Sequence, residues 1–302
     1  MRNPGYAIAL LILLAVQTSS AQIQDETGLV APNAEVVKLG EGYSFTEGPV
    51  ADPSGNVFFT DQPNNKILKW EAETGKISVF SDQAGRSNGM FFDNKGNLIA
   101  CADEHNQLWS INARGKHKVL VKERDGKLLN GPNDVWVHPN GNIYFTDPLY
   151  ARDYWKRTPE KQQDGEHVYL LKPGKKELIV LNSGVVKPNG IIGSPDGKNL
   201  YIADIGDKKI YRYVIEPDGT VSGRSLAAPM AADGITLDEK GNLYLAGNGI
   251  TVFDKNARQI AHIPVRKGWS ANVTFGGTDR RLLFVTAGDA VFGIRMNVKG
   301  AY

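Results

Sequence analysis

Glu47-Gly48-Pro49-Val50, followed by the turn Asp52-Pro53-Ser54-Gly55-Asn56 and by Val57-Phe58-Phe59-Thr60-Asp61, is the stretch that decides the fold. It consists of a polar leading residue, a short apolar run, a turn with Gly-Asn and a second apolar run. The leading residue stands eight positions before the turn glycine, and the same offset recurs with the leading residues Asn88, Asn133, Asn189 and Asp233. A sixth copy begins at Asn272 and has Arg280 in place of the glycine. Six copies at one offset indicate six repeated units.

The spacing of the copies indicates the type of repeat. Successive leading residues are 41, 45, 56, 44 and 39 residues apart, which fits four-stranded propeller blades and is too long for leucine-rich or ankyrin repeats. Val135-Trp136-Val137 and Ile143-Tyr144-Phe145-Thr146 are β-rich runs on either side of one turn, as expected for two paired strands. The sequence therefore predicts an all-β fold, a six-bladed β-propeller over residues 34–302.

The leading residues share one register and are predicted to meet. The innermost strand of each propeller blade lines the central channel, so these residues would form a ring: Glu47, Asn88, Asn133, Asn189, Asp233 and Asn272. Their carboxylate and amide oxygens are hard donors, and a formal charge of −2 matches a divalent cation. Asn and Asp also serve turns through local hydrogen bonds, but a buried polar ring without partners would be costly. We therefore expect a divalent metal site in the channel.

Residues 1–21 have the features of a signal peptide. Arg2 is followed by the apolar run Ala7–Val16 and by the small residues Ser19-Ser20-Ala21. The run is too short to cross a bilayer, which takes about 20 residues. We expect an exported protein, periplasmic or secreted, with no membrane span after cleavage.

The remaining chain has features of one compact β domain. Residues 22–33 suggest a flexible lead-in, and Ala34–Leu39 suggests a strand that completes the last blade and closes the ring. The net charge is +2 and the lysines and arginines are scattered among acids, which argues against a nucleic-acid partner. Cys101 is the only cysteine, so no internal disulfide can form. The sequence gives no indication of oligomeric state.

Two segments are predicted to emerge beside the ring. Blade three carries an insertion between Asp147 and Val168, and the strand order places it on the face where the leading residues lie. It is either a lid that brings Arg152 and Tyr154 to the substrate or a solvated excursion. His105 follows the second strand of blade two and is expected on the same face.

Several of these motifs resemble one known family. Glu47-Gly48-Pro49, Pro132-Asn133-Asp134-Val135 with Phe145-Thr146-Asp147-Pro148, Asn189-Gly190 and Asp233-Gly234 are similar to the senescence-marker-protein/gluconolactonase family of calcium-dependent six-bladed propellers, which includes regucalcin. The match is close to the bacterial gluconolactonase branch. The resemblance implies that Glu47, Asn189 and Asp233 bind the metal, that Asn133 is a fourth ligand or a substrate contact, and that Asp233 is the acid/base. One departure is Gly131, where the regucalcin branch has a substrate-contacting arginine.

The expected function is metal-dependent hydrolysis of a small-molecule sugar lactone. The cation, Ca²⁺ with Mg²⁺, Mn²⁺ or Zn²⁺ as alternatives, would polarise the lactone carbonyl. Asp233 would take the proton from the attacking water, with His105 as the alternative base. Asn88, Asn133, Arg152 and Tyr154 are the expected substrate contacts. Alternatives are phosphotriester or aryl-ester hydrolysis on the same metal, and a non-catalytic binding propeller with a structural calcium.

Overall fold

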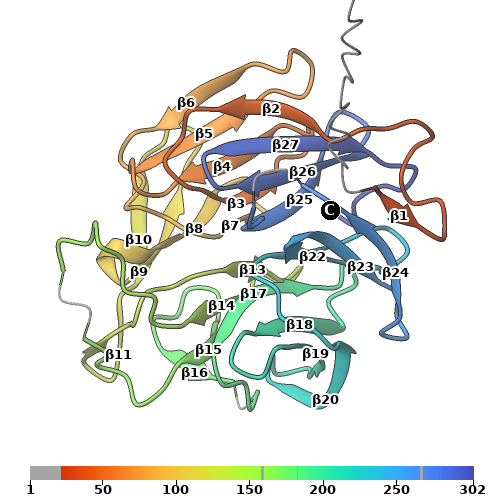
Figure 1. Ribbon diagram of the computed structural model, residues 1–302. Helices are drawn as coiled ribbons and strands as arrows, with labels where there is room; N and C mark the ends of the chain where they lie inside the picture. Colours follow the sequence, from red (N-terminus) through yellow and green to blue (C-terminus); the bar gives the residue numbers. More distant parts are fainter. Residues whose placement is uncertain (1–21, 158–159, 182, 266–267) are drawn as a thin grey trace, which may run out of the picture.

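Six antiparallel sheets are arranged around a central axis (Figure 1). The computed structural model describes residues 22–157, 160–181, 183–265 and 268–302. The inner strand of each sheet contacts the inner strands of its two neighbours all the way round the axis. The predicted six-bladed β-propeller is confirmed, and the predicted signal peptide lies outside the described residues.

The first three blades follow one another along the chain. Blade one contains β3 (Thr46–Ala51), β4 (Val57–Asp61), β5 (Lys66–Trp70) and β6 (Ile77–Ser81). Blade two contains β7 (Met90–Phe92), β8 (Leu98–Ala102), β9 (Gln107–Ile111) and β10 (His117–Val121), with the 3-10 helix η1 (Asp103–His105) between β8 and β9. The hairpin of β11 (Glu123–Arg124) and β12 (Lys127–Leu128) precedes blade three, which contains β13 (Val135–Val137), β14 (Ile143–Asp147), β15 (His167–Leu171) and β16 (Leu178–Val180).

The last three blades complete the ring. Blade four contains β17 (Pro188–Gly193), β18 (Asn199–Asp204), β19 (Lys209–Ile215) and β20 (Val221–Ala228). Blade five contains β21 (Ile235–Leu237), β22 (Leu243–Gly247), β23 (Gly249–Phe253), β24 (Gln259–Ile263) and the added β1 (Gln24–Asp25). Blade six contains β25 (Asn272–Gly276), β26 (Leu282–Ala287), β27 (Ala290–Arg295) and β2 (Val37–Glu41).

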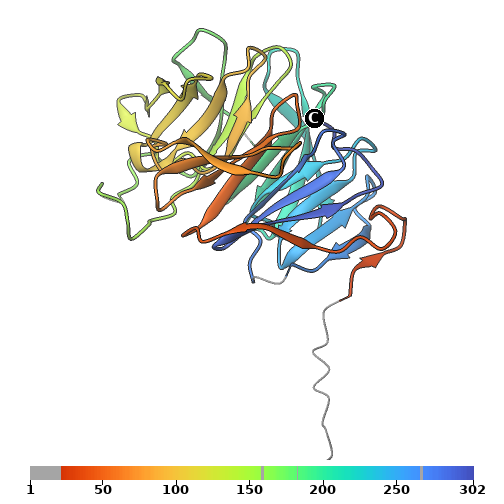
Figure 2. The same cartoon turned by 90° about the horizontal axis from the view of Figure 1, so that it is seen from above.

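An N-terminal strand closes the propeller, as predicted. β2 pairs antiparallel with β27, with Val37 opposite Gly293 and Glu41 opposite Ala290. Figure 2 shows this red strand lying along the blue strands of blade six. The strand begins a few residues later than the expected range 34–39. Because β2 covers the edge of β27, the last sheet has four strands, as blades one to four do.

The segment 22–33 is packed against the propeller, which corrects the expectation of a flexible lead-in. β1 pairs with β24, with Gln24 opposite His262, and Val30 forms a bridge with Met296. Leu29 is 2% exposed and belongs to the apolar core of blades five and six. The apolar side chains of this short segment bury against an outer edge that the repeat pattern does not reveal.

The turn geometry confirms the sixth copy of the repeat. The five turn glycines have the left-handed conformation, with φ of +85° at Gly55, +79° at Gly96, +89° at Gly141, +71° at Gly197 and +80° at Gly241. Arg280 has a φ of +62° at the equivalent place. Glycine is favoured there because a Cβ atom is strained in this region. Blade six therefore keeps the same turn despite the arginine.

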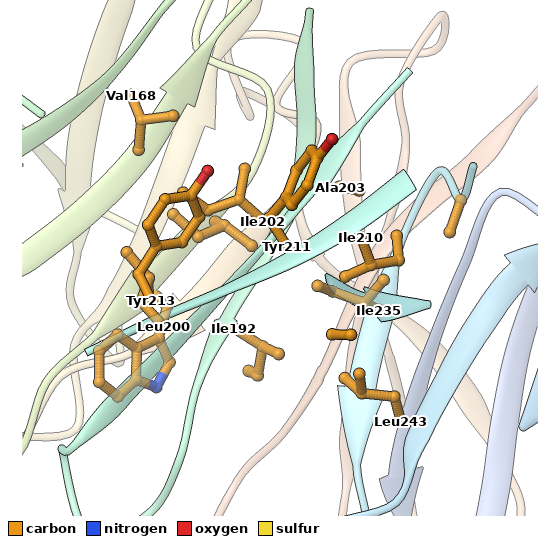
Figure 3. Close-up of a cluster of buried hydrophobic side chains, with 14 of the residues drawn as sticks. Val168, Ile192, Leu200, Ile202, Ala203, Ile210, Tyr211, Tyr213, Ile235 and Leu243 are labelled. Carbon is orange, nitrogen blue, oxygen red and sulfur yellow. The ribbon is translucent and has the colours of Figure 1, made fainter. Parts of the chain in front are cut away.

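The blades are held together by apolar side chains that pack between neighbouring sheets. Ile192, Ile202 and Ile210 of blade four lie in one cluster with Val168 of blade three and Ile235 of blade five (Figure 3). Burying such a side chain stabilises the fold by roughly 1.5–3 kcal/mol. The third strands of blades one, two and four also contribute buried aromatic side chains: Trp70, Trp109 and Tyr211.

Among the described residues, no helix is long and apolar enough to cross a membrane.

Candidate active site

The six leading residues meet at one level of the channel, as the repeat register predicts. Glu47, Asn88, Asn133, Asn189 and Asn272 are between 2% and 8% exposed, and Asp233 is half-buried. Backbone hydrogen bonds tie neighbouring inner segments together: the Gly89 amide donates to Asn133 O at 2.7 Å and the Gly190 amide to Asp233 O at 2.9 Å.

Glycine follows four of the leading residues because the next blade packs against it. A Cβ atom on Gly48 would lie 2.0 Å from the carbonyl oxygen of Asn88, and one on Gly234 would lie 2.0 Å from Asn272 Oδ1. Either contact is too close to tolerate a side chain. The missing side chain thus lets adjacent leading residues approach each other.

Glu47 and Asp233 are the two acidic residues of the ring and belong to blades one and five, with Asn272 of blade six between them. Burial, followed by the charge of Asp233, raises the pKa of Glu47 to about 8. Burial also raises the pKa of Asp233, opposed first by a hydrogen bond from Trp269 and then by one from Asn189. Asn272 Nδ2 donates to Glu47 Oε2 at 3.3 Å. The two carboxyl groups are held close enough for their charges to repel.

The ring residues fit the predicted divalent cation. Within the described part of the chain no three His, Cys, Asp or Glu side chains gather as a metal-binding group, so a cation here depends on amide oxygens beside Glu47 and Asp233. Asn189 donates its amide nitrogen to the Tyr150 hydroxyl at 3.2 Å, which leaves its amide oxygen available. Asn133 supplies another amide oxygen at the same level. Two carboxylates with amide oxygens, without imidazole or thiolate, suit Ca²⁺ better than Zn²⁺.

Asp134 is a buried acid at the ring that the sequence analysis did not single out. It is 8% exposed, and its carboxyl group accepts the backbone amides of Val135 at 2.9 Å and Ile191 at 3.1 Å. Burial raises its pKa to about 7. The sequence could have revealed Asp134, because it directly follows a leading residue at a position where four of the other five copies have glycine.

Residues 148–157 of the blade-three insertion lie on the ring face and touch both neighbouring blades. Lys187 Nζ of blade four donates to Leu149 O at 3.4 Å. On the other side, the Lys156 amide donates to Glu104 Oε1 of blade two at 3.2 Å. The segment therefore spans from blade four to blade two beside the ring.

Arg152 and Tyr154, the predicted substrate contacts of this insertion, lie near the ring. Burial raises the pKa of both Glu47 and Asp233, and the positive charge of Arg152 is among the effects that oppose this rise. Its Nε lies 3.9 Å from Asp103 Oδ2, too far for a hydrogen bond. Arg152 Nε and the Tyr154 hydroxyl are buried without a hydrogen-bond partner among the described residues. Both donors therefore lack a hydrogen-bond partner that the described residues could supply.

Arg157 occupies the space beside Gly131. A Cβ atom on Gly131 would lie 2.4 Å from Asp103 Oδ1 and 2.9 Å from Arg157 Nη2. Arg157 Nη2 also donates to Asn130 O at 2.6 Å. An arginine from the insertion thus packs against Gly131, which lies two residues before Asn133 and has no side chain of its own.

His105 is not brought to the ring. Its side chain is exposed and stacks on Trp109 with 5.3 Å between ring centroids. Asp103, two residues earlier in η1, is 4% exposed instead. The structure therefore does not support His105 as the base next to Asp233.

Most of the chain matches one protein family. A family model described as the SMP-30/gluconolactonase/LRE-like region matches residues 45–289. The chain belongs to this family. The matched range contains all six leading residues and the blade-three insertion, so the candidate site lies wholly inside the SMP-30/gluconolactonase region.

Several proteins of known activity or structure are similar to this chain over most of its length. A gluconolactonase of Zymomonas mobilis is 27% identical in an alignment of length 292 that covers 87% of this chain and 81% of the relative. The diisopropyl-fluorophosphatase of Loligo vulgaris is 26% identical in an alignment of length 251 that covers 74% of this chain and 79% of the relative. The solved structure of a gluconolactonase from Xanthomonas campestris has a TM-score of 0.85 and 26% identity, and the alignment covers 92% of this chain and 96% of that one.

Proposed function

We propose that this protein is a metal-dependent lactone hydrolase that acts on sugar lactones. The observation that carries the proposal is the meeting of Glu47 and Asp233 with amide side chains in one ring of the channel. Similarity to gluconolactonases over most of the chain supports the same reaction. The substrate is a small neutral molecule that enters from the ring face.

Asp233 is the base of the proposed reaction. A divalent cation held by Glu47, Asn133, Asn189 and Asp233 supplies Lewis-acid polarisation of the lactone carbonyl when bound. The water oxygen forms a bond to the carbonyl carbon while Asp233 accepts its proton. The ring C–O bond then breaks, and Asp233 returns the proton to the departing ring oxygen, which gives the open hydroxy acid.

Three further side chains are proposed to bind the sugar. Asn88 is 2% exposed at the ring level, where its amide can hydrogen-bond a hydroxyl group. Arg152 and Tyr154 offer buried donors from the insertion. The cation we propose is Ca²⁺, with Mg²⁺, Mn²⁺ and Zn²⁺ as alternatives that metal analysis separates. We also propose export to the periplasm or the medium, on the features of residues 1–21.

One activity screen tests the function. Purified protein is assayed with δ-gluconolactone, an aryl ester and a phosphotriester, before and after chelation. We expect chelation to abolish lactone hydrolysis and Ca²⁺ to restore it. Asp233→Asn that keeps the cation and loses turnover supports the mechanism, and unchanged hydrolysis excludes Asp233 as the base.

Phosphotriester or aryl-ester hydrolysis is the second candidate. Similarity to the Loligo vulgaris diisopropyl-fluorophosphatase favours its inclusion in the screen, because one metal centre can serve several substrates. A cation that binds without any turnover would instead favour a binding propeller with a structural calcium.

A further inference from the structure

Three aspartates outside the proposed ligand set end the second strands of their blades. Asp61 ends β4 of blade one, Asp147 ends β14 of blade three and Asp204 ends β18 of blade four. They are 2%, 0% and 0% exposed, respectively. A buried carboxylate is costly unless it is fully hydrogen-bonded, so each of them needs compensating partners.

Each carboxyl group accepts two successive backbone amides from the segment that leads into the inner strand of its own blade. The N–H groups donate over 2.8 to 3.2 Å and come from Ser44 and Phe45 to Asp61, from Asn130 and Gly131 to Asp147, and from Val186 and Lys187 to Asp204. Two donors on one carboxyl group hold two successive residues of the backbone in place. The three carboxyl groups therefore fix the backbone at these places.

The backbone amides that donate to these aspartates occupy equivalent positions in the three blades. In every case they lie three and two residues before the leading residue, which is Glu47, Asn133 or Asn189. These leading residues are three of the four proposed cation ligands. The second strands of the other blades end in Ala102, Gly247 and Ala287, which have no carboxyl group.

We propose that Asp61, Asp147 and Asp204 are positioning residues, here called the clamp aspartates, that hold Glu47, Asn133 and Asn189 in the geometry of the cation site. The inference rests on the cation of the proposed function. Groups that orient metal ligands affect affinity because a site that is already ordered loses less conformational freedom on binding. Asp233, the fourth ligand, is held differently, because its carboxyl oxygen accepts a hydrogen bond from the Trp269 side chain.

A clamp aspartate could alternatively serve only the stability of its blade. The chain offers a matched control on the opposite face, where Asp93 Oδ1 accepts the amides of Lys95 and Asn97, each at 2.8 Å. Asp93 lies in the turn between β7 and β8 of blade two, on the face away from the ring. Asp93→Asn thus removes the charge of a carboxyl group that also accepts two backbone amides, without touching a segment that carries a proposed ligand.

The test measures Ca²⁺ affinity by isothermal titration calorimetry on the chelated full chain. Asp147→Asn and Asp204→Asn should each raise the Kd for Ca²⁺ by about tenfold or more, while Asp93→Asn should change it less than about twofold even where its Tm falls. An unchanged Kd in both clamp variants overturns the proposal. If a variant does not fold, the other one, in a separate blade, carries the test, and Asp204→Glu should restore part of the affinity. A wild-type chain that binds no Ca²⁺ overturns the cation of the proposed function itself, which is a distinguishable result.

Discussion

Trp269 Nε1 donates a hydrogen bond of 2.9 Å to Asp233 Oδ2. The tryptophan is 50% exposed and follows blade five in the chain, so the proposed base is oriented by an aromatic residue at the mouth of the site. The hydrogen bond lowers the pKa of Asp233 and opposes the effect of burial. A planar apolar ring next to the base also suits the apolar face of a sugar ring.

Trp269→Phe should lower kcat/KM for a sugar lactone by about tenfold, because a hydrogen bond to a charged group contributes about 1.5–3 kcal/mol. Phenylalanine keeps an aromatic surface and removes the donor. Steady-state kinetics and Ca²⁺ titration on the same preparation separate a change in turnover from a loss of the cation. Unaltered kinetics would show that this hydrogen bond does not orient the base.

Removal of residues 37–41 should expose the edge of β27, because β2 is its pairing partner. An uncovered strand edge invites pairing between molecules. We expect aggregation on size-exclusion chromatography and loss of activity. A soluble, monodisperse and active deletion variant would contradict the role of β2 in closing the propeller.

The propeller and the ring could be predicted from the sequence because both depend on a local pattern that repeats. One short stretch contains the leading residue, the apolar runs and the turn glycine. The symmetry of the propeller then places equivalent residues of the six stretches at the same height in the channel. The closing strand also follows from this logic, since an unpartnered strand before the first blade has only the last blade to join.

Contacts between different loops could not be predicted in the same way. Trp269 and Tyr150 reach the ring from segments outside the repeated stretch. Asp103 and His105 both leave blade two on the ring face, but the turn of η1 directs the first inward and the second to solvent. The order of the strands predicts on which face of the propeller a loop emerges, but it does not predict the direction in which each side chain of that loop points.

Asp103 should make stability depend on pH. Burial raises its pKa from 3.8 to about 7, although Arg152 and Arg157 oppose the shift and Glu104 adds to it. Between these two pH values the folded chain binds a proton that the unfolded chain does not, so stability from this group falls as pH rises from about 4 to 7 and is level above. Relative to Asp103→Asn, the wild type should lose on the order of a few kcal/mol over this range.

Denaturant unfolding of both proteins in the presence of a chelator, from pH 4.5 to 8.5, measures this difference without a contribution from the cation. A difference that stays constant across the range would mean that Asp103 has the same pKa in the folded and unfolded chains.

Glu47→Gln should release the cation. Only two of the six ring residues carry a charge, and hard cations are selected largely by the number of charged ligands. Metal analysis and lactone hydrolysis should therefore decline together, with a Ca²⁺ affinity reduced by at least about a hundredfold. Because burial disfavours the ionised form of Glu47, the same variant should be at least as stable as the wild type without cation. Full retention of Ca²⁺ would remove Glu47 from the ligand set.

Asn88→Ala should keep the cation and change the kinetics. Asn88 holds the equivalent position in the next blade, but it is outside the ligand set implied by the family. Its backbone amide donates to Cys101 O at 3.0 Å, a contact that the substitution leaves in place, so the strand should persist. If the side-chain amide binds a substrate hydroxyl equally in the ground and transition states, KM rises and kcat stays constant. A purely structural residue would lower Tm and leave both constants unchanged, and loss of Ca²⁺ would place Asn88 among the ligands. Metal content, Tm and steady-state kinetics on one preparation separate these outcomes.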